Sequence, residues 1–172
     1  MKTRTATLQD IPALHYLINS AYRGESSKKG WTTEADLLGG QRTDPELLKE
    51  MIQNPQSRIE LLVDGEEILG CVYLEEQSDG LYLGMLTVNP EIQAQGLGKK
   101  LMNHADELAR SLQLPAVKMQ VIKGREELIQ FYQRRGFKFT GKTEPFPHDD
   151  PRYGIAQMKL EFLEMKKEIH HS

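Results

Sequence analysis

The sequence predicts an α/β (α+β) fold in which helices cover both faces of a mixed, mostly antiparallel central sheet. Segments with strand and helix patterns follow one another in the order β-α-α-β-β-β-α-β-α-β-β. Two turn sequences, Asp64-Gly65 and Ser78-Asp79-Gly80, join consecutive strand patterns as hairpins. The helix-length segments between the other strands carry apolar residues every three or four positions, which is typical of helices packed on a sheet.

The chain begins with a short strand pattern at Lys2–Thr7. Thr7 and Asp10 have the spacing of a capping box, and an apolar helix face then continues to about Tyr22. The stretch Arg23–Gln41 is rich in glycine, serine, threonine and charge. We expect a long surface loop there, with a helical turn around Glu34–Leu38, and loops of this length are often functional.

The second helix starts at Asp44-Pro45 and ends at Asn54-Pro55. Leu47, Leu48, Met51 and Ile52 form its apolar face. The strands expected after it are Ile59–Val63, Ile68–Leu74 and Leu81–Val88.

The C-terminal half alternates helices and strands. A helix follows the turn Gln93–Gly98, and a second helix at Glu126–Arg135 stops at Gly136, where a left-handed cap is favourable. Strands are expected at Val117–Ile122, Phe137–Thr143 and Ile155–Phe162, with an extended loop at Glu144–Pro151. We therefore expect one domain over residues 1–163 and a polar tail over residues 164–172.

Composition excludes several classes of protein. The 172 residues suit one domain, and the net charge of -3 argues against nucleic-acid binding. No apolar run approaches the length of a membrane span, and no signal layout opens the chain, so we expect a cytoplasmic protein, as a monomer or homodimer, with no membrane partner. The single cysteine, Cys71, excludes an internal disulfide framework. We expect no metal site.

The turn Gln93–Gly98 carries the strongest functional signal. It follows a buried strand and opens a helix, and Gly96 and Gly98 have no side chain to block a ligand. Main-chain N–H groups in the first turn of a helix lack intrahelical partners, so they can bind phosphate. Lys99 adds a cation nearby. Glycines before a helix also make tight structural turns, so this spacing alone leaves both interpretations open.

Two motifs resolve this choice through a resemblance. Gln93, Gly96 and Gly98, with Thr87-Val88-Asn89-Pro90 before them, match a turn that members of the GNAT superfamily of acetyltransferases carry after a strand. About 35 residues further on, Leu128, Phe131-Tyr132 and Gly136-Phe137 look like the family's helix that ends in Leu-Tyr-x-x-x-Gly-Phe. The chain therefore resembles a GNAT acetyltransferase over nearly its whole length.

The resemblance implies acetyl-CoA as the acyl donor, with two sheet strands splayed apart to receive it. The main-chain N–H groups of the turn would hold the pyrophosphate, and the strand Leu86–Val88 would pair with the pantetheine arm. An N–H near Val88 would face the thioester carbonyl. The implied cofactor residues are Leu86, Thr87, Val88, Gln93, Ala94, Gln95, Gly96, Leu97, Gly98 and Lys99. Arg125 stands where the family often has asparagine, which leaves that contact open.

Tyr132 matches the family tyrosine that serves as a general acid near the sulfur, although it could also be a core aromatic. The reaction implied is direct attack of a neutral amine on the thioester. No residue stands out as the general base, and the candidates Glu34, Glu75, Glu76 and His148 compete with a water chain.

The acceptor is expected to be a primary amine of a small molecule. Trp31, Glu34 and His148 lie in the two loops in which we expect acceptor specificity to lie, and the acidic residues of these loops suit a cation. Three alternatives stay open: an acetyltransferase acting on a protein amine, a non-catalytic acyl-CoA sensor, and an enzyme that binds another phosphate ligand.

Overall fold

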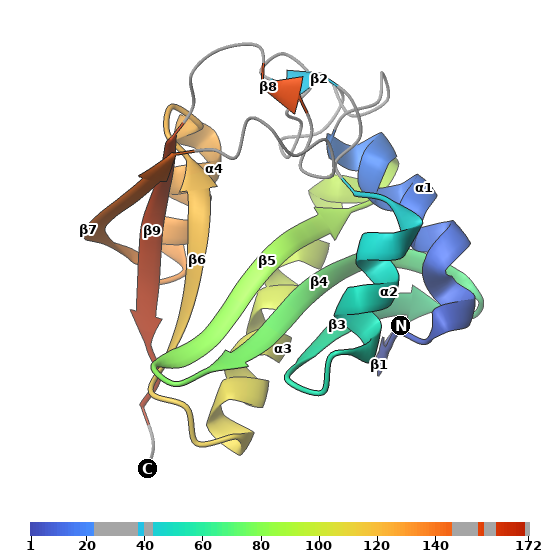
Figure 1. The fold of residues 1–172 in the computed structure, drawn as a ribbon, viewed down its shortest axis with the longest axis horizontal. Helices are drawn as coiled ribbons and strands as arrows, with labels where there is room; N and C mark the ends of the chain where they lie inside the picture. Colours follow the sequence, from blue (N-terminus) through green and yellow to red (C-terminus); the bar gives the residue numbers. More distant parts are fainter. Residues whose placement is uncertain (23–37, 40–42, 146–154, 157–160, 171–172) are drawn as a thin grey trace.

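The computed structural model describes residues 1–22, 38–39, 43–145, 155–156 and 161–170. Their centre is a seven-stranded sheet in the order β1-β3-β4-β5-β6-β9-β7 (Figure 1). Only β5 and β6 pair in parallel, and every other neighbouring pair in this sheet is antiparallel. The predicted α/β fold with a mixed, mostly antiparallel sheet is confirmed.

The α-helices and the strands of the large sheet up to β7 lie close to the segments that the sequence patterns predict. The strands of the large sheet are β1 (Lys2–Thr5), β3 (Ser57–Asp64), β4 (Glu67–Gln77), β5 (Gly80–Val88), β6 (Ala116–Ile122), β7 (Lys138–Pro145) and β9 (Glu161–Glu168). The α-helices are α1 (Ile11–Tyr22), α2 (Pro45–Gln53), α3 (Leu97–Ser111) and α4 (Glu126–Arg134). Two 3-10 helices are η1 (Leu8–Asp10) and η3 (Pro90–Gln95), and β2 (Leu38–Gly39) pairs with β8 (Ile155–Ala156).

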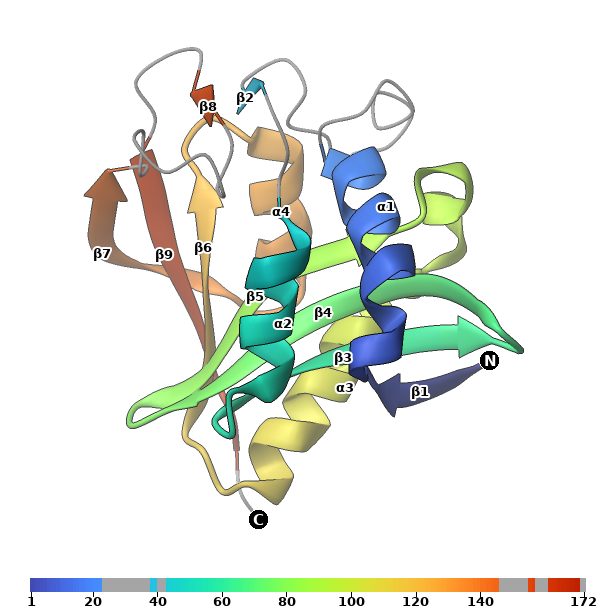
Figure 2. The same cartoon turned by 45° about the vertical axis from the view of Figure 1, so that its right-hand side comes forward.

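Two apolar cores lie on opposite faces of the sheet (Figure 2). One core joins α1 and α2 to β3, β4 and β5, and includes Leu14, Leu48 and Cys71. The other joins α3 and α4 to β4, β5 and β6, and includes Leu101 and Tyr132. Successive side chains along a strand point to opposite faces of the sheet, so each central strand contributes residues to both cores.

Local hydrogen bonds begin the helices where the sequence predicts. The side chain of Asp44 accepts a 2.8 Å hydrogen bond from the Leu47 N–H at the start of α2. The Thr7 N–H donates to Asp10 Oδ2 at 2.8 Å, which forms the predicted capping box. Gly136, at φ 96°, follows α4 as a left-handed residue.

The C-terminal part differs from the sequence expectation. A strand was expected at Ile155–Phe162 and a polar tail over residues 164–172, whereas β9 spans Glu161–Glu168 and lies between β6 and β7. Met165 is fully buried at the centre of this strand. Only Leu163 and Met165 form an apolar face in this strand, and Glu164, Lys166, Lys167 and Glu168 surround Met165. The pattern is therefore hard to distinguish from a solvated tail.

Among the described residues, no helix combines the length and apolar character that crossing a membrane requires.

Candidate active site

The two strands at the centre of the sheet, β5 and β6, pair at one end and then diverge (Figure 1). Their register consists of two pairs, Leu81↔Val117 and Tyr82↔Lys118. Beyond Tyr82 the edge of β5 that faces β6 has no ladder, while its other edge continues to pair with β4 up to Val88. A ligand can run beside a strand at the point where it separates from its neighbour in the sheet.

A small cavity of about 60 Å³, here called the strand cleft, lies between the diverging strands. Leu83–Leu86 of β5 and Met119–Ile122 of β6 form its walls. Arg125, Leu128 and Tyr132 of the α4 region also line it. These three residues are spaced by three and four positions, so one face of the helix points into the cleft.

Tyr132 is 6% exposed and packs edge-on against Phe131 and Phe137, with ring centroids 5.6 Å and 6.0 Å away. Packing on its neighbours orients the ring, and the same side chain borders the cleft. Tyr132 is therefore both a core aromatic and a residue of the cleft. The two positions considered from the sequence, in the core and at the cofactor site, do not exclude each other.

The turn before α3 contains a left-handed glycine. Gly96 is left-handed, with φ 73° and ψ 20°, and it is the N-cap residue of α3. A Cβ at Gly96 would meet no atom within 4 Å, so the space beside this turn is open. The first intrahelical bond runs from the Lys100 N–H to the Gly96 carbonyl at 3.2 Å. The preceding amides of the first turn have no intrahelical acceptor, which suits an anion.

A β-bulge in β5 lies at the strand cleft. Cys71 of β4 pairs with Thr87 and Tyr73 pairs with Gly84, so Met85 and Leu86 together oppose one residue of β4. Met85 has φ 55°, which is uncommon for a residue with a side chain. The buried hydroxyl of Thr87 donates to the Met85 carbonyl at 2.8 Å. Thr87 thus holds the bulge, and the bulge sets the direction of the amides that border the cleft.

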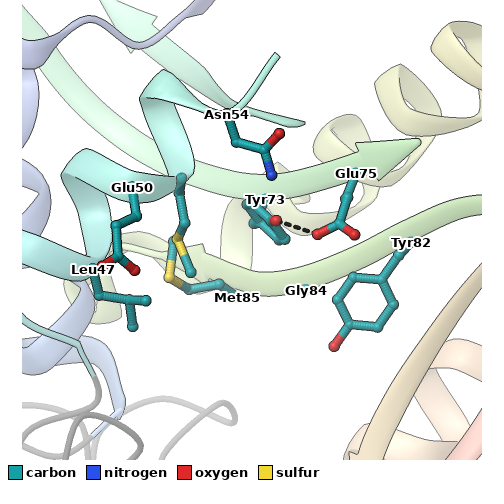
Figure 3. Close-up of a pocket in the computed structure, with 9 residues that line it drawn as sticks. Leu47, Glu50, Asn54, Tyr73, Glu75, Tyr82, Gly84 and Met85 are labelled. Carbon is teal, nitrogen blue, oxygen red and sulfur yellow. Dashed lines mark hydrogen bonds between the residues drawn. The ribbon is translucent and has the colours of Figure 1, made fainter. Parts of the chain in front are cut away.

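A second cavity of about 340 Å³, here called the α2 cavity, lies between α2 and the strands β4 and β5 (Figure 3). Leu47, Glu50 and Met51 of α2, and Asn54 at its C-cap, form one side of it. Tyr73 and Glu75 of β4, and Tyr82, Gly84 and Met85 of β5, form the other. Gly84 and Met85 line both cavities, so the two meet at the bulge.

The polar centre of the α2 cavity is the pair formed by Tyr73 and Glu75. The Tyr73 hydroxyl donates to Glu75 Oε2 at 2.5 Å (Figure 3). Burial and then the Glu75 hydrogen bond raise the pKa of Tyr73 well above its usual value. Tyr73 therefore stays protonated at neutral pH and holds the Glu75 carboxylate as a hydrogen-bond donor.

Comparison with known proteins identifies the family to which this arrangement of strands and helices belongs. The model of the acetyltransferase (GNAT) family matches residues 13–137, a span that contains the diverging strands, the glycine turn and α4.

The chain belongs to the acetyltransferase (GNAT) family.

Relatives agree with this assignment. A peptidyl-lysine N-acetyltransferase, YjaB from Salmonella typhimurium, is 26% identical over 139 residues, which cover 79% of this chain and 74% of the relative. A ribosomal-protein-S18-alanine N-acetyltransferase from Escherichia coli has a similar fold, with a TM-score of 0.73 at 14% identity over 99% of this chain and 95% of that one.

The yncA protein from Salmonella typhimurium, solved with acetyl-CoA, gives a TM-score of 0.70 at 17% identity over 100% of this chain and 95% of that one. The GNAT fold and the enzyme class expected from the sequence, an N-acetyltransferase, are confirmed.

The GNAT fold brings some of the predicted site residues together. Leu86 and Tyr132 line the strand cleft, whereas the side chain of Thr87 turns to the bulge and Val88 is buried in the core. Gly96–Lys99 open α3. The main chain of Gln93–Gln95 forms the last part of η3. Trp31, Glu34 and His148 lie outside the described residues.

Sequence reasoning missed the bulge and most of the α2 cavity. Met85 gives no signal in the sequence, because methionine is not favoured at positive φ. The cavity lining could have been found, since the hairpin turn at Ser78-Asp79 fixes the register and so places Glu75 opposite Tyr82. No group of three or more metal-ligating side chains occurs in the part of the chain that the structure describes.

Proposed function

We propose that the chain transfers an acetyl group from acetyl-CoA to a primary amine, with the donor in the strand cleft and the acceptor in the α2 cavity. The observation that carries this proposal is the meeting of the two cavities at Gly84–Met85. A thioester in one cavity and an amine in the other can approach each other there. Holding two reactants in this way supplies much of the rate of an acyl transfer.

The donor side is supported by main-chain geometry. The amides of Gly96–Lys99 would bind the pyrophosphate, and the strand Leu86–Val88, which forms no ladder with β6, would run beside the pantetheine arm. Both interactions use backbone groups, so they depend on the left-handed Gly96 and on the divergence of β5 from β6. Gln93, Ala94 and Gln95 would complete the phosphate turn.

The chemistry requires two proton transfers. The neutral amine attacks the thioester carbon, a C–N bond forms, and the tetrahedral species collapses with cleavage of the C–S bond. Glu75 is our candidate for the group that accepts the proton of the ammonium, because it lies in the α2 cavity and Tyr73 orients it. Tyr132 is our candidate for the acid that protonates the leaving thiolate from the cleft side.

The carboxylates of Glu50 and Glu75 favour a cationic acceptor in the α2 cavity. A small-molecule amine is the acceptor that the sequence predicts. A second candidate is the side-chain amine of a lysine in a protein, which is favoured by the similarity to the peptidyl-lysine N-acetyltransferase YjaB. Both acceptors would present the same primary amine to the bulge.

The test is release of CoA thiol from acetyl-CoA over a panel of amino acids, polyamines and lysine peptides, together with calorimetric titration of acetyl-CoA, ATP and NAD. We expect micromolar binding of acetyl-CoA alone and turnover with at least one amine. Binding without turnover on any amine would favour the acyl-CoA sensor. Binding of ATP or NAD in place of acetyl-CoA would contradict the proposal.

A further inference from the structure

Three polar side chains follow one another along β4 at the wall of the α2 cavity. Tyr73, Glu75 and Gln77 occupy alternate positions near the C-terminal end of this strand. Alternate residues project from the same face of a sheet, and their Cα atoms lie roughly 6.6 Å apart. Long side chains at this spacing can contact one another along the strand.

Both oxygens of the Glu75 carboxylate accept hydrogen bonds from these neighbours. The Tyr73 hydroxyl donates to Oε2 at 2.5 Å, and Gln77 Nε2 donates to Oε1 at 3.2 Å. Two donors on different oxygens fix the plane of a carboxylate, whereas one donor leaves it free to rotate about that contact. An ionised carboxylate has about four acceptor sites, so sites remain for a ligand in the α2 cavity, which Glu75 lines.

The neighbouring strands leave room for this arrangement. In β5, Gly84 stands opposite Tyr73 and Gly80 stands opposite Gln77. The ladder with β3 ends before Gln77. Among the paired residues of β3 and β5, none therefore places a side chain directly opposite Gln77. Its side chain can lie along β4 against Glu75.

The two residues that stand opposite Glu75 are directed elsewhere. The Ser57 hydroxyl donates to the Met51 carbonyl at 2.7 Å. The Tyr82 ring leans over Gly84, where an added Cβ would lie 3.0 Å from Cε1 of the ring. Among the described residues, the hydrogen bonds that hold the carboxylate therefore come from its own strand.

We propose that Gln77 is a positioning residue, which acts together with Tyr73 to fix the Glu75 carboxylate in the orientation that faces the acceptor amine. This inference rests on the proposed function, in which Glu75 accepts the proton of the ammonium. A base acts only within hydrogen-bond reach of the proton that it removes, and a displacement of about 1 Å can lower the rate by about 100-fold. A carboxylate that rotates keeps its charge, so it still attracts the ammonium but accepts its proton less often. Loss of a donor should therefore lower kcat and leave the KM for the amine unchanged.

The experiment removes each donor and keeps a side chain of similar size. Gln77→Met and Tyr73→Phe are assayed with acetyl-CoA and with the amine of the panel above that gives the highest kcat/KM. We expect kcat to fall about ten-fold in each variant, with the KM for the amine and for acetyl-CoA within about two-fold of wild type. The matched controls are Gln53→Met, an exposed change on α2, and Tyr16→Phe, an exposed change on α1, and both should keep the wild-type kcat.

A double-mutant cycle distinguishes positioning from a structural role. Glu75→Gln alone should lower kcat by about 100-fold or more, which is the usual contribution of a general base. In the Glu75→Gln background, a further Gln77→Met or Tyr73→Phe change should alter kcat by less than about two-fold, because the group that these residues position is already lost. A residue that supports only the fold of the hairpin would lower kcat by the same factor in both backgrounds.

Two results overturn the inference and leave the proposed function in place: a wild-type kcat in Gln77→Met, or an equal effect of Gln77→Met with and without Glu75. A wild-type kcat in Glu75→Gln contradicts the role of Glu75 as the base in the proposed function, and the inference with it. Absence of turnover with every amine of the panel contradicts the acetyl transfer itself. Denaturant unfolding of Gln77→Met should match the wild type, because Gln77 is partly exposed, and a match assigns the kinetic change to the site and not to loss of the fold.

Discussion

At the scale of single residues, Tyr132 combines packing and access to the strand cleft. Its ring lies between Phe131 and Phe137, while the side chain borders the divergence of β5 and β6. Removing only the hydroxyl should leave the packing in place. A change in turnover would then report the chemistry of the phenol and not the stability of the core.

We predict that Tyr132→Phe lowers kcat by ten-fold or more, because general acid catalysis typically contributes at least that much. The KM for acetyl-CoA and the free energy of unfolding should change little. Steady-state kinetics over a range of pH measure the effect. Tyr16→Phe is the matched control, since Tyr16 is 77% exposed on α1. Unchanged kinetics for Tyr132→Phe at every pH would remove the phenol from the mechanism.

The sequence predicts part of this site for a clear reason. Gly96 and Tyr132 belong to local patterns, a glycine before a helix and an aromatic on a helix face, and both patterns can be recognised without knowing the partners of the segment. Met85 and Glu50 cannot be recognised in this way. The bulge depends on pairing with β4, and the α2 cavity depends on how α2 packs on the sheet.

At the scale of elements, the start of α3 depends on a left-handed residue. We predict that Gly96→Ala lowers the free energy of unfolding by about 1 kcal/mol, because a Cβ disfavours this conformation. It should also raise the Kd of acetyl-CoA by ten-fold or more, because relief of the strain would turn the amides of the first turn away from the phosphate. Denaturant unfolding and calorimetric titration measure the two effects.

Gly65 provides the control for that prediction. It has φ 62°, close to the 73° of Gly96, and a Cβ there would also meet nothing within 4 Å. Gly65 lies in the turn between β3 and β4 and is not part of the glycine turn that opens α3. Gly65→Ala should therefore cost similar stability and leave acetyl-CoA binding unchanged. Equal loss of acetyl-CoA binding in both variants would mean that Gly96 acts through general stability alone.

The junction of β1 with the first helical turns gives a prediction about pH. Arg4 donates to both carboxylate oxygens of Asp10 at 2.8 Å and 2.9 Å, and this contact is the main cause that lowers the pKa of Asp10. A carboxyl with a lowered pKa in the folded state stabilises the protein above its unfolded pKa, about 3.9. That contribution is lost as the pH falls through the folded value.

We predict that Asp10→Asn costs about 1 kcal/mol of unfolding free energy at pH 7, the size of a lost cap, since the 45% exposure of Arg4 lets solvent screen the ion pair. The difference from wild type should shrink at pH 3 and below. Urea unfolding at both pH values measures it, with Glu107→Gln on the exposed side of α3 as control. A difference in unfolding free energy that does not change with pH would show that the ionised Asp10 carboxylate does not contribute to stability.

At the scale of the whole molecule, the strand order separates what the sequence predicts from what it does not. Hairpin turns predict that β3, β4 and β5 are neighbours, because a two-residue loop leaves no other pairing. The insertion of β9 between β6 and β7 joins segments that are distant in the chain. β9 can pair only once β6 and β7 are in place on either side of it. Its own sequence is mostly polar, and only Met165 in it is fully buried.

The seam between the two halves of the sheet is the short stretch where β5 and β6 pair before they diverge at the strand cleft. The seam consists of the register pairs Leu81↔Val117 and Tyr82↔Lys118, next to Gly80. A Cβ on Gly80 would lie 2.7 Å from the carbonyl oxygen of Ala116. This oxygen belongs to the main chain of β6, so it cannot move without moving the strand.

We predict that Gly80→Ala lowers the free energy of unfolding by about 2 kcal/mol or more, because the seam must widen to remove the overlap. Widening there changes the angle at which β5 and β6 diverge, so affinity for acetyl-CoA should fall as well. Urea unfolding and calorimetric titration on the same samples measure both. Ser78→Ala, an exposed change in the same turn, is the control. If Gly80→Ala were as stable as the wild type, the seam could widen without loss of free energy. The opening of the cleft would then be determined by α3 and α4 and not by the seam.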